Sequence, residues 1–179
     1  MPFKRRVIKN YQNIWAFTRS SKFLYKKMVK NIDFSRDIQI IEFWAWDWIF
    51  TDELIKQTSK NSKIFIFEID EGFCKILKEK YKNEPKVIIY EKSASCAEEL
   101  FKNNSIDYIL SSLPLAFINT KNITQILNGA KKILKPNGDF IQFQYFLQNK
   151  KDIKNTFKKI DYTFTFLNFP PAFIYICHK

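Results

Sequence analysis

Runs of apolar residues alternate with amphipathic stretches along most of the chain. Five short runs, rich in β-branched and aromatic residues, have the length and composition of buried strands. They occupy residues 38–43, 63–69, 86–90, 107–112 and 139–145. Each run precedes a stretch with helical spacing of apolar positions, at 51–59, 71–82, 95–103, 121–134 and 149–159. This alternation predicts a parallel sheet that is covered by helices on both faces.

The end of the chain has a different pattern. Two β-type runs, YTFTFLNF and AFIYIC, flank Pro170-Pro171 and predict an antiparallel strand pair at one edge of the sheet. The helix expected at 121–134 should stop at the Lys135-Pro136-Asn137-Gly138 segment, because proline and glycine end helices. With 179 residues and no linker or repeat, the pattern predicts one domain over residues 1–179.

Charge changes this picture at the N-terminus. The chain has a net charge of +12, and residues 1–32 hold nine Lys or Arg and no acidic residue. Such an excess favours a negatively charged partner, nucleic acid or anionic lipid, although a Lys-rich and Phe-rich composition also follows from an AT-rich genome. Apolar residues alternate with the basic ones, so residues 1–34 are expected to form a basic helical segment. This segment would cover the ligand site and lie on an anionic membrane. The alternative is a helix that only packs on the domain.

The apolar runs and the few Cys and His residues limit where the protein can be expected and which metal or acid-base chemistry it could support. The apolar runs are too short or too interrupted to cross a bilayer, and no secretory signal follows Met1, so we expect a cytoplasmic protein, peripheral on the inner face of the membrane. The three Cys are scattered and the single His is His178, which argues against a metal site, a Ser-His triad or a His general base.

The segment after the first strand holds the strongest functional signal. Ligands of open parallel sheets bind beyond the carboxyl ends of the strands. Here Glu42 is followed by Trp44, Trp46 and Trp48 at alternate positions, and Glu68 ends the second strand. An acid at that second position commonly accepts hydrogen bonds from the ribose of a nucleoside, although it is often only a helix cap.

With glycine in place of the three Trp, this segment reads IEFGAGDGIFTDEL and resembles the E-x-G-x-G-x-G-x-x-T motif of class I S-adenosylmethionine-dependent methyltransferases. The segments WAFTRSSKFLYKKM, SSLPLAF, ILKPNGDFIQFQY and NFPPAFIYI also resemble, in order, blocks of the bacterial phospholipid N-methyltransferases. The resemblance implies a Rossmann-like class I α/β fold, S-adenosyl-L-methionine as cofactor, and a phospholipid amine such as phosphatidylethanolamine as methyl acceptor. RNA is the second candidate partner, and no obligate protein partner is inferred.

The resemblance also implies roles for individual residues. Glu42 would orient the loop and the methionine amine, Glu68 would bind the ribose, and Ile69 would pack on the adenine. Ser93 stands where the family commonly has Asp, so the KSAS segment at 92–95 is either the adenine block or an ordinary polar loop. The residues expected to bind the cofactor are Glu42, Trp44, Ala45, Trp46, Trp48, Thr51, Glu68, Ile69, Ser93, Ala94 and Ser111.

The residues expected at the reacting centre are Ser112, Pro114 and Tyr145. Related adenine N6-methyltransferases carry N-x-P-Y/F at this place, and Ser112 and Leu115 depart from that pattern, which argues against adenine. Pro114 could simply end the strand, and Tyr145, Asn168, Pro170, Pro171 and Tyr175 could form either the far wall of the site or part of the core. Attack of a neutral amine on a sulfonium methyl group needs positioning more than a strong base. Tyr145 or water is the candidate proton acceptor.

All four Trp, at positions 15, 44, 46 and 48, fall where the resembled family has glycine. A non-glycine residue in the left-handed region costs about 1–2 kcal/mol, and three indoles would fill the space for the cofactor. We interpret these Trp as UGA codons that some bacterial lineages read as glycine. The alternatives are a genuine Trp-bearing protein without cofactor, acting as a basic lipid- or nucleic-acid-binding module, and an enzyme like the ribosomal RNA adenine dimethylases.

Overall fold

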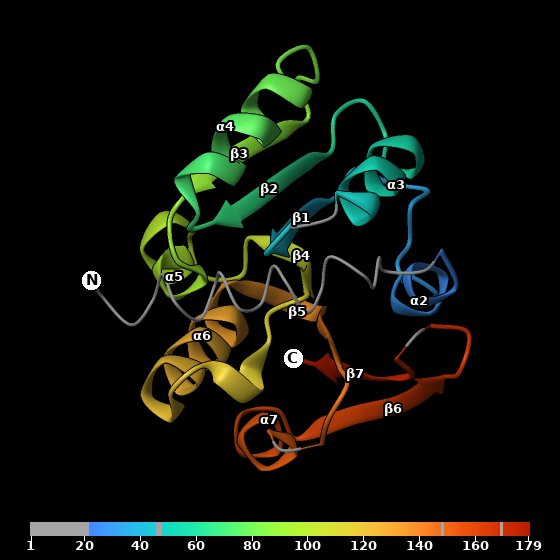
Figure 1. Ribbon diagram of the computed structural model, residues 1–179, viewed down its shortest axis with the longest axis vertical. Coiled ribbons are helices and arrows are strands. Elements are labelled where there is room, and N and C mark those ends of the chain that lie inside the picture. The colour runs from blue at the N-terminus through green and yellow to red at the C-terminus, as the bar shows by residue number, and fades with distance from the viewer. Residues whose placement is uncertain (1–21, 46–47, 148, 169) are drawn as a thin grey trace.

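The computed structural model describes residues 22–45, 48–147, 149–168 and 170–179. The fold is built on one seven-stranded sheet with the order β3-β2-β1-β4-β5-β7-β6 (Figure 1). The strands are β1 Gln39–Phe43, β2 Lys63–Glu68, β3 Val87–Glu91, β4 Ile106–Ser111, β5 Leu134–Gln144, β6 Lys159–Thr165 and β7 Ala172–His178. The first five are parallel, and β7 pairs antiparallel with both β5 and β6. The predicted parallel sheet and its antiparallel C-terminal pair are confirmed.

The helices lie on both faces of this sheet, as the alternating pattern predicted. They are α2 Lys22–Met28, α3 Ile49–Gln57, α4 Glu71–Lys80, α5 Ala97–Leu100, α6 Thr120–Ile133 and α7 Lys150–Thr156, with short 3₁₀ turns η1 Ala94–Cys96 and η2 Leu115–Phe117. Figure 1 shows α3 and α4 on one side of the sheet and α6 and α7 on the other. None of the helices in the described ranges is long and apolar enough to cross a membrane.

Successive residues of each strand feed two separate cores. In β1, Ile40 packs with α2, α3 and α4, whereas its neighbour Ile41 packs in the cluster that contains residues of α5, α6 and α7. Both side chains are fully buried. A strand that is buried on both faces reads as a continuous apolar run, which explains why the runs could be recognised in the sequence.

The helix α6 ends just before the Lys135–Gly138 segment, as predicted, but the segment itself lies within β5. It does not separate a helix from a strand: α6 ends at Ile133 and β5 begins at Leu134. The pairing with β4 shifts register, since Leu134 pairs with Ile106 but Asp139 pairs with Tyr108. A Cβ on Gly138 would lie 2.7 Å from the carbonyl oxygen of Asp107, so the strand passes too close to β4 for any larger residue. The proline and glycine therefore mark a β-bulge.

Two other predicted helices end early. The stretch 95–103 forms only η1 and the four-residue α5, because Phe101 leaves the helix and packs edge-on against Phe65, with ring centroids 4.8 Å apart. The stretch 149–159 ends at Thr156, since Lys159 already begins β6. Pairing with a neighbouring strand overrides helical spacing at this point.

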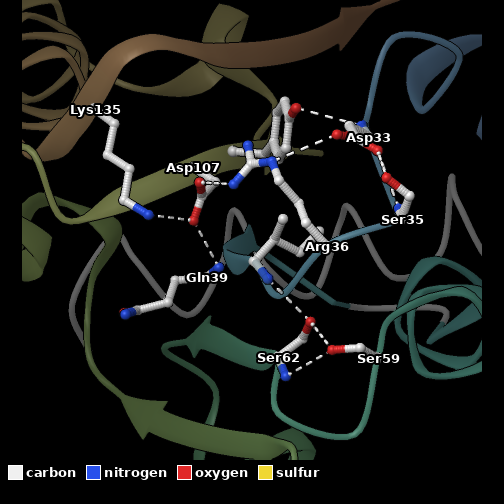
Figure 2. Close-up of polar contacts among 10 residues, drawn as sticks. Asp33, Ser35, Arg36, Gln39, Ser59, Ser62, Asp107 and Lys135 are labelled. Atoms are coloured by element: carbon white, nitrogen blue, oxygen red, sulfur yellow. Dashed lines mark hydrogen bonds and ion pairs between the residues drawn. The ribbon is translucent and has the colours of Figure 1, made fainter.

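A buried charge cluster closes the amino edge of the sheet (Figure 2). The carboxylate of Asp107 accepts hydrogen bonds from Arg36 Nη1 at 2.7 Å, Lys135 Nζ at 2.8 Å and the Gln39 amide at 2.9 Å. Burial by itself would raise the pKa of Asp107, but these hydrogen bonds outweigh burial and lower it. The cluster thus links the starts of β1, β4 and β5, at the edge opposite to the one where ligands bind.

Candidate cofactor and acceptor site

The order of the strands places the candidate site. The chain moves from β1 outward to β2 and β3, and then returns to β4 on the other side of β1. A crevice for a ligand forms outside the carboxyl ends of the strands at such a reversal. The loop after β1 and the turn after β4 meet there, since the Ser112 amide donates to the carbonyl oxygen of Phe43 at 3.1 Å.

The loop after β1 is held on its two sides by hydrogen bonds. The buried carboxylate of Glu42 accepts a 2.5 Å hydrogen bond from Thr51 Oγ1, which ties β1 to the first turn of α3. The Trp44 amide donates to the Phe67 carbonyl at the end of β2, and Ala45 is buried. Glu42 and Thr51 therefore shape the loop, in line with the orienting role that the resemblance implied for Glu42.

Two tryptophans of this loop have a left-handed backbone. The φ angle is 70° at Trp44 and 47° at Trp48, and no glycine has a positive φ in the described part of the chain. Trp48 also precedes the first residue of α3, where it offers no side-chain cap. Both positions thus have the conformation that favours glycine. Trp46 and Trp15 lie outside the described residues.

The indoles of these tryptophans find neighbours on opposite sides of the loop. The Trp48 ring stacks on Phe73 of α4, with centroids 6.0 Å apart, and Lys80 Nζ lies 5.7 Å from its centroid. Trp44 instead forms part of the wall of the pocket beside β4 and β5. Its side chain therefore occupies space at the mouth of the site.

Glu68 has the character of a ligand-binding carboxylate. Its Oε1 accepts hydrogen bonds from the amides of Ile69 at 2.7 Å and Asp70 at 2.9 Å, whereas its buried Oε2 has no partner among the described residues. Burial raises the pKa of Glu68. The cap of α4 is Asp70, which accepts from the Phe73 amide. Glu68 is therefore not the N-cap of α4, and its role in binding a ligand stays a prediction.

The segments after β2 and β3 contain the remaining residues that were predicted to bind the cofactor. Ile69 follows β2 and is 54% exposed, so one apolar face is open beside Glu68. Ser93 Oγ accepts from the amide of Ser95 at 3.3 Å and contacts its hydroxyl oxygen at 2.9 Å, and Ala94 is buried. Ser93 thus caps η1, as expected of an ordinary polar turn.

A small cavity of about 30 Å³ lies next to the carboxyl ends of β4 and β5. It has room for about two water molecules. The wall consists of Trp44, Ser112, Leu113, Pro114, Ala116, Phe117, Phe143, Gln144, Tyr145 and Phe146. The predicted residues Ser112, Pro114 and Tyr145 therefore lie together, and Ser111, fully buried, ends β4 beneath them. In the described part of the chain this wall includes no carboxylate, lysine or histidine.

The polar contacts of this wall centre on one carbonyl. The oxygen of Leu113 accepts hydrogen bonds from Gln142 Nε2 at 3.1 Å and from Gln144 Nε2 at 2.8 Å. On the far side, Asn168 Nδ2 donates to the hydroxyl oxygen of Tyr145 at 3.3 Å and to the Pro170 carbonyl at 2.8 Å. Tyr145 thus lines the pocket and Asn168 is joined to it by a hydrogen bond, while their part in a substrate site stays a prediction.

The sequence left the place of one aromatic residue open and did not indicate two residues of the pocket wall. Tyr175 is 1% exposed and belongs to the core, which was one of its two interpretations. Leu115 is also buried, and Phe117 instead brings an aromatic ring to the pocket. Gln144 was missed, although a polar residue between Phe143 and Tyr145 of a buried strand was a signal that could have found it.

The cysteines add no reactive group to the site. Cys74 and Cys177 are buried, and Cys96 is half-buried. Burial raises the pKa of Cys74 to about 11, which leaves the thiol protonated at neutral pH.

Comparison with known proteins agrees with this geometry. Residues 49–138 match the model of a family described as a methyltransferase domain. Over 179 residues the chain is 21% identical to an ornithine lipid N-methyltransferase of Singulisphaera acidiphila, and the match covers 98% of this chain and 93% of that protein.

Solved structures share the fold at low identity. A 1,6-didemethyltoxoflavin-N1-methyltransferase of Burkholderia thailandensis, solved with its substrate and S-adenosylhomocysteine, superposes with a TM-score of 0.73 at 12% identity, covering 96% of this chain and 83% of that one. A S-adenosylmethionine-dependent methyltransferase of Aquifex aeolicus gives a TM-score of 0.64 at 11% identity, covering 86% and 88%.

Proposed function

The chain belongs to the methyltransferase-domain family and is an S-adenosylmethionine-dependent methyltransferase, and from this premise we propose that it methylates the amine of a membrane phospholipid such as phosphatidylethanolamine. The relative from Singulisphaera acidiphila, whose name specifies N-methylation of a lipid, supports this choice of acceptor. The apolar wall of the pocket supports it as well, because it suits a headgroup that arrives with its acyl chains.

The residues after β1 and β2 fit S-adenosylmethionine. Glu68 offers a buried oxygen, Oε2, that has no partner among the described residues, and a ribose hydroxyl would satisfy it. The exposed side chain of Ile69 beside it would cover one face of the adenine. Glu42, locked by Thr51, would hold the loop that carries the methionine end.

When bound, S-adenosylmethionine supplies an electrophilic methyl group. The residues of the chain then act mainly by positioning, because a neutral amine is already a nucleophile. Gln144 would hold the Leu113 carbonyl in place, and Asn168, which donates to the Tyr145 hydroxyl oxygen, would fix the position of Tyr145 in the pocket wall. Tyr145 or water would receive the proton that leaves the ammonium group.

The same proposal takes positions 15, 44, 46 and 48 as glycine in the protein that the cell makes, through UGA codons. The left-handed backbone at Trp44 and Trp48 supports it, since glycine adopts that conformation without strain. Loss of the Trp44 indole would also widen the pocket that it now lines. The intact mass of the protein from its own source tests this point: it should be lower by four Trp-to-Gly differences, and a mass with four Trp would refute it.

The carbonyl of Leu113 is the observation that favours a lipid amine over adenine most directly. By resemblance, adenine N6-methyltransferases use the carbonyl before the proline to receive the base amine. Here both Gln142 and Gln144 already donate to that oxygen, which has only two lone pairs. An adenine amine would have to displace one of these buried amides.

One observation favours RNA as a second candidate. The ring of Phe117 lines the pocket next to Pro114 and is mostly exposed, so it could stack on a base. An adenine-methylating enzyme would then use Phe117 as the aromatic residue that its motif normally has at the position of Leu115.

A methyl-transfer assay separates the two candidates. Protein with glycine at positions 15, 44, 46 and 48 is incubated with radiolabelled S-adenosylmethionine and either phosphatidylethanolamine vesicles or ribosomal RNA. We expect label in the lipid and none in the RNA, and a Glu68→Gln variant should show a higher KM for the donor. Label in RNA alone would refute the proposed acceptor, and no affinity for the donor would refute the enzyme.

A further inference from the structure

Large apolar side chains are exposed mainly at one edge of the sheet. Nine such side chains are about half exposed or more among the described residues, and six of them follow the carboxyl ends of strands. Ile69 follows β2, Phe117 lies in η2 after β4, Phe146 and Leu147 follow β5, and Phe166 and Leu167 follow β6. Side chains of this size gathered at one edge indicate a contact with another apolar phase.

The topology brings the end of β6 to the same edge as the end of β5. Strand β7 is antiparallel to both of its neighbours, so β6 runs in the direction of β5. Phe166 and Leu167 are 79% and 62% exposed at the end of β6, and Phe146 and Leu147 follow the end of β5. We call Phe117, Phe146, Leu147, Phe166 and Leu167 the apolar rim. Two of them, Phe117 and Phe146, also line the cavity beside Ser112, Pro114 and Tyr145, which we call the acceptor pocket.

Positive charge lies beside the apolar rim. Helix α2 packs on the end of β6, where Lys27 Nζ donates a hydrogen bond to the Phe164 carbonyl oxygen. Residues 22–30 contain Lys22, Lys26, Lys27 and Lys30 and no acidic residue. Phe23, which is 53% exposed, precedes Lys27 by one helical turn. Apolar side chains flanked by lysines are typical of proteins that lie on anionic membranes.

The opposite edge of the sheet has the reverse character. The ion cluster of Asp107 lies there (Figure 2), and His178 contacts Asp139 at 2.7 Å and Asp161 at 3.1 Å. None of the nine exposed large apolar residues of the described ranges lies at that edge. The molecule is therefore polarised along the strand direction, with one apolar and basic end and one end of paired charges.

We propose that the apolar rim inserts into the surface of an anionic lipid bilayer, with the lysines of α2 on the lipid phosphates, so that the acceptor pocket opens directly onto the membrane. The choice of a membrane rests on charge: the basic α2 beside the rim complements anionic lipid, and the rim itself is apolar. The inference rests on the proposed lipid acceptor for its purpose, but the contact itself does not require catalysis.

The test is sedimentation of the full chain with vesicles. Vesicles of phosphatidylglycerol and phosphatidylethanolamine are compared with vesicles of phosphatidylcholine, for the unaltered protein, a Phe166→Ser/Leu167→Ser variant and a matched Ile76→Ser control. Ile76 is 50% exposed on α4, away from the apolar rim. We expect the double variant to lose at least about tenfold in partitioning to the anionic vesicles, and the control to lose little.

A second variant tests the charge. Lys22→Gln/Lys26→Gln should also weaken binding to the anionic vesicles, and more so at low than at high salt. Both lysines are exposed, so the substitutions should leave the thermal unfolding midpoint unchanged. Equal binding of the unaltered protein and the rim variant, or equal losses in the rim variant and the Ile76 control, would overturn the proposed contact.

Activity separates this inference from the proposed function. Both proteins carry glycine at positions 15, 44, 46 and 48 in this assay. Phosphatidylethanolamine dispersed in detergent micelles needs no insertion into a bilayer, so the rim variant should methylate it at the rate of the protein with an unaltered rim. If neither protein methylates dispersed lipid although the unaltered one binds vesicles, the acceptor assignment fails and the membrane contact stands. If both proteins methylate the dispersed lipid and neither binds vesicles, the acceptor assignment stands and the membrane contact fails.

Discussion

Replacing Trp44 or Trp48 by glycine should relieve backbone strain that replacement by alanine cannot relieve. Both residues have a positive φ, 70° and 47°. An L-residue pays about 1–2 kcal/mol in this region, and glycine pays about 0.5–1 kcal/mol in unfolded-state entropy. The glycine variant should therefore be more stable than the alanine variant by about 1 kcal/mol at each position.

Comparing glycine with alanine removes the indole from the calculation. Trp48 loses its stacking on Phe73 and its contact with Lys80 in both variants, so these losses cancel. Urea unfolding followed by circular dichroism gives the difference from the shift in midpoint. The matched control is Lys75, exposed within α4, where alanine should be the more stable residue by about 1 kcal/mol because the backbone is helical.

The reasoning is refuted if alanine equals or exceeds glycine at both loop positions while the Lys75 control behaves as expected. A second measurement concerns the site itself. By resemblance, position 44 lines the cofactor, so Trp44→Gly should increase the affinity for S-adenosylhomocysteine in a calorimeter. It should also open the pocket wall that Trp44 lines, whereas Trp48→Gly alone should leave that wall in place.

Three further substitutions probe single contacts. Asp107→Asn should cost about 2 kcal/mol at neutral pH, since it leaves partly solvated cations without their carboxylate; because the pKa of Asp107 is lowered in the fold, the difference in unfolding free energy should shrink as the pH falls below the usual value of 3.8. Glu68→Gln should instead raise the stability. Because burial raises the pKa of Glu68, the variant should be the more stable protein in urea at neutral pH, and this advantage should be absent below pH 4.5. The same variant should bind the methyl donor at least about tenfold more weakly in a calorimeter. Lys86→Met should lower the thermal midpoint, because Lys86 Nζ donates to the carbonyls of Ile55 at 2.6 Å and Thr58 at 3.1 Å at the end of α3, at a loss of about 1–3 kcal/mol.

Much of the fold could be predicted from the sequence because its strands are buried on both sides. Ile40 and Ile41 each need a core, so the run that contains them is apolar throughout and can be recognised without a structure. The bulge at Lys135–Gly138 could not be predicted in this way. It depends on the approach of Gly138 to the Asp107 carbonyl, and that contact joins two strands that are far apart in the chain.

The candidate site shows the same division. Glu42 and Glu68 could be placed because each lies at or next to the end of a recognisable strand, and both carboxylates are buried in the structure. Phe117 and Gln144 could not, since which side chains reach the pocket depends on how the turn after β4 folds back onto β5. The roles assigned to residues 1–21, 46 and 47 remain predictions, since these residues lie outside the described part of the chain.

The two glutamine amides that meet at the Leu113 carbonyl have a mechanical consequence for substrate entry. Moving the turn after β4 outward would leave the buried Gln144 amide without this acceptor, at about 1–3 kcal/mol. Gln142 Nε2 would keep its 2.7 Å hydrogen bond to the Phe143 carbonyl oxygen. The opposite rim at Phe146 and Leu147 is exposed and pays no such penalty. We therefore expect a headgroup larger than the present cavity to be accommodated by movement of the Phe146–Leu147 segment, while the turn after β4 keeps its place.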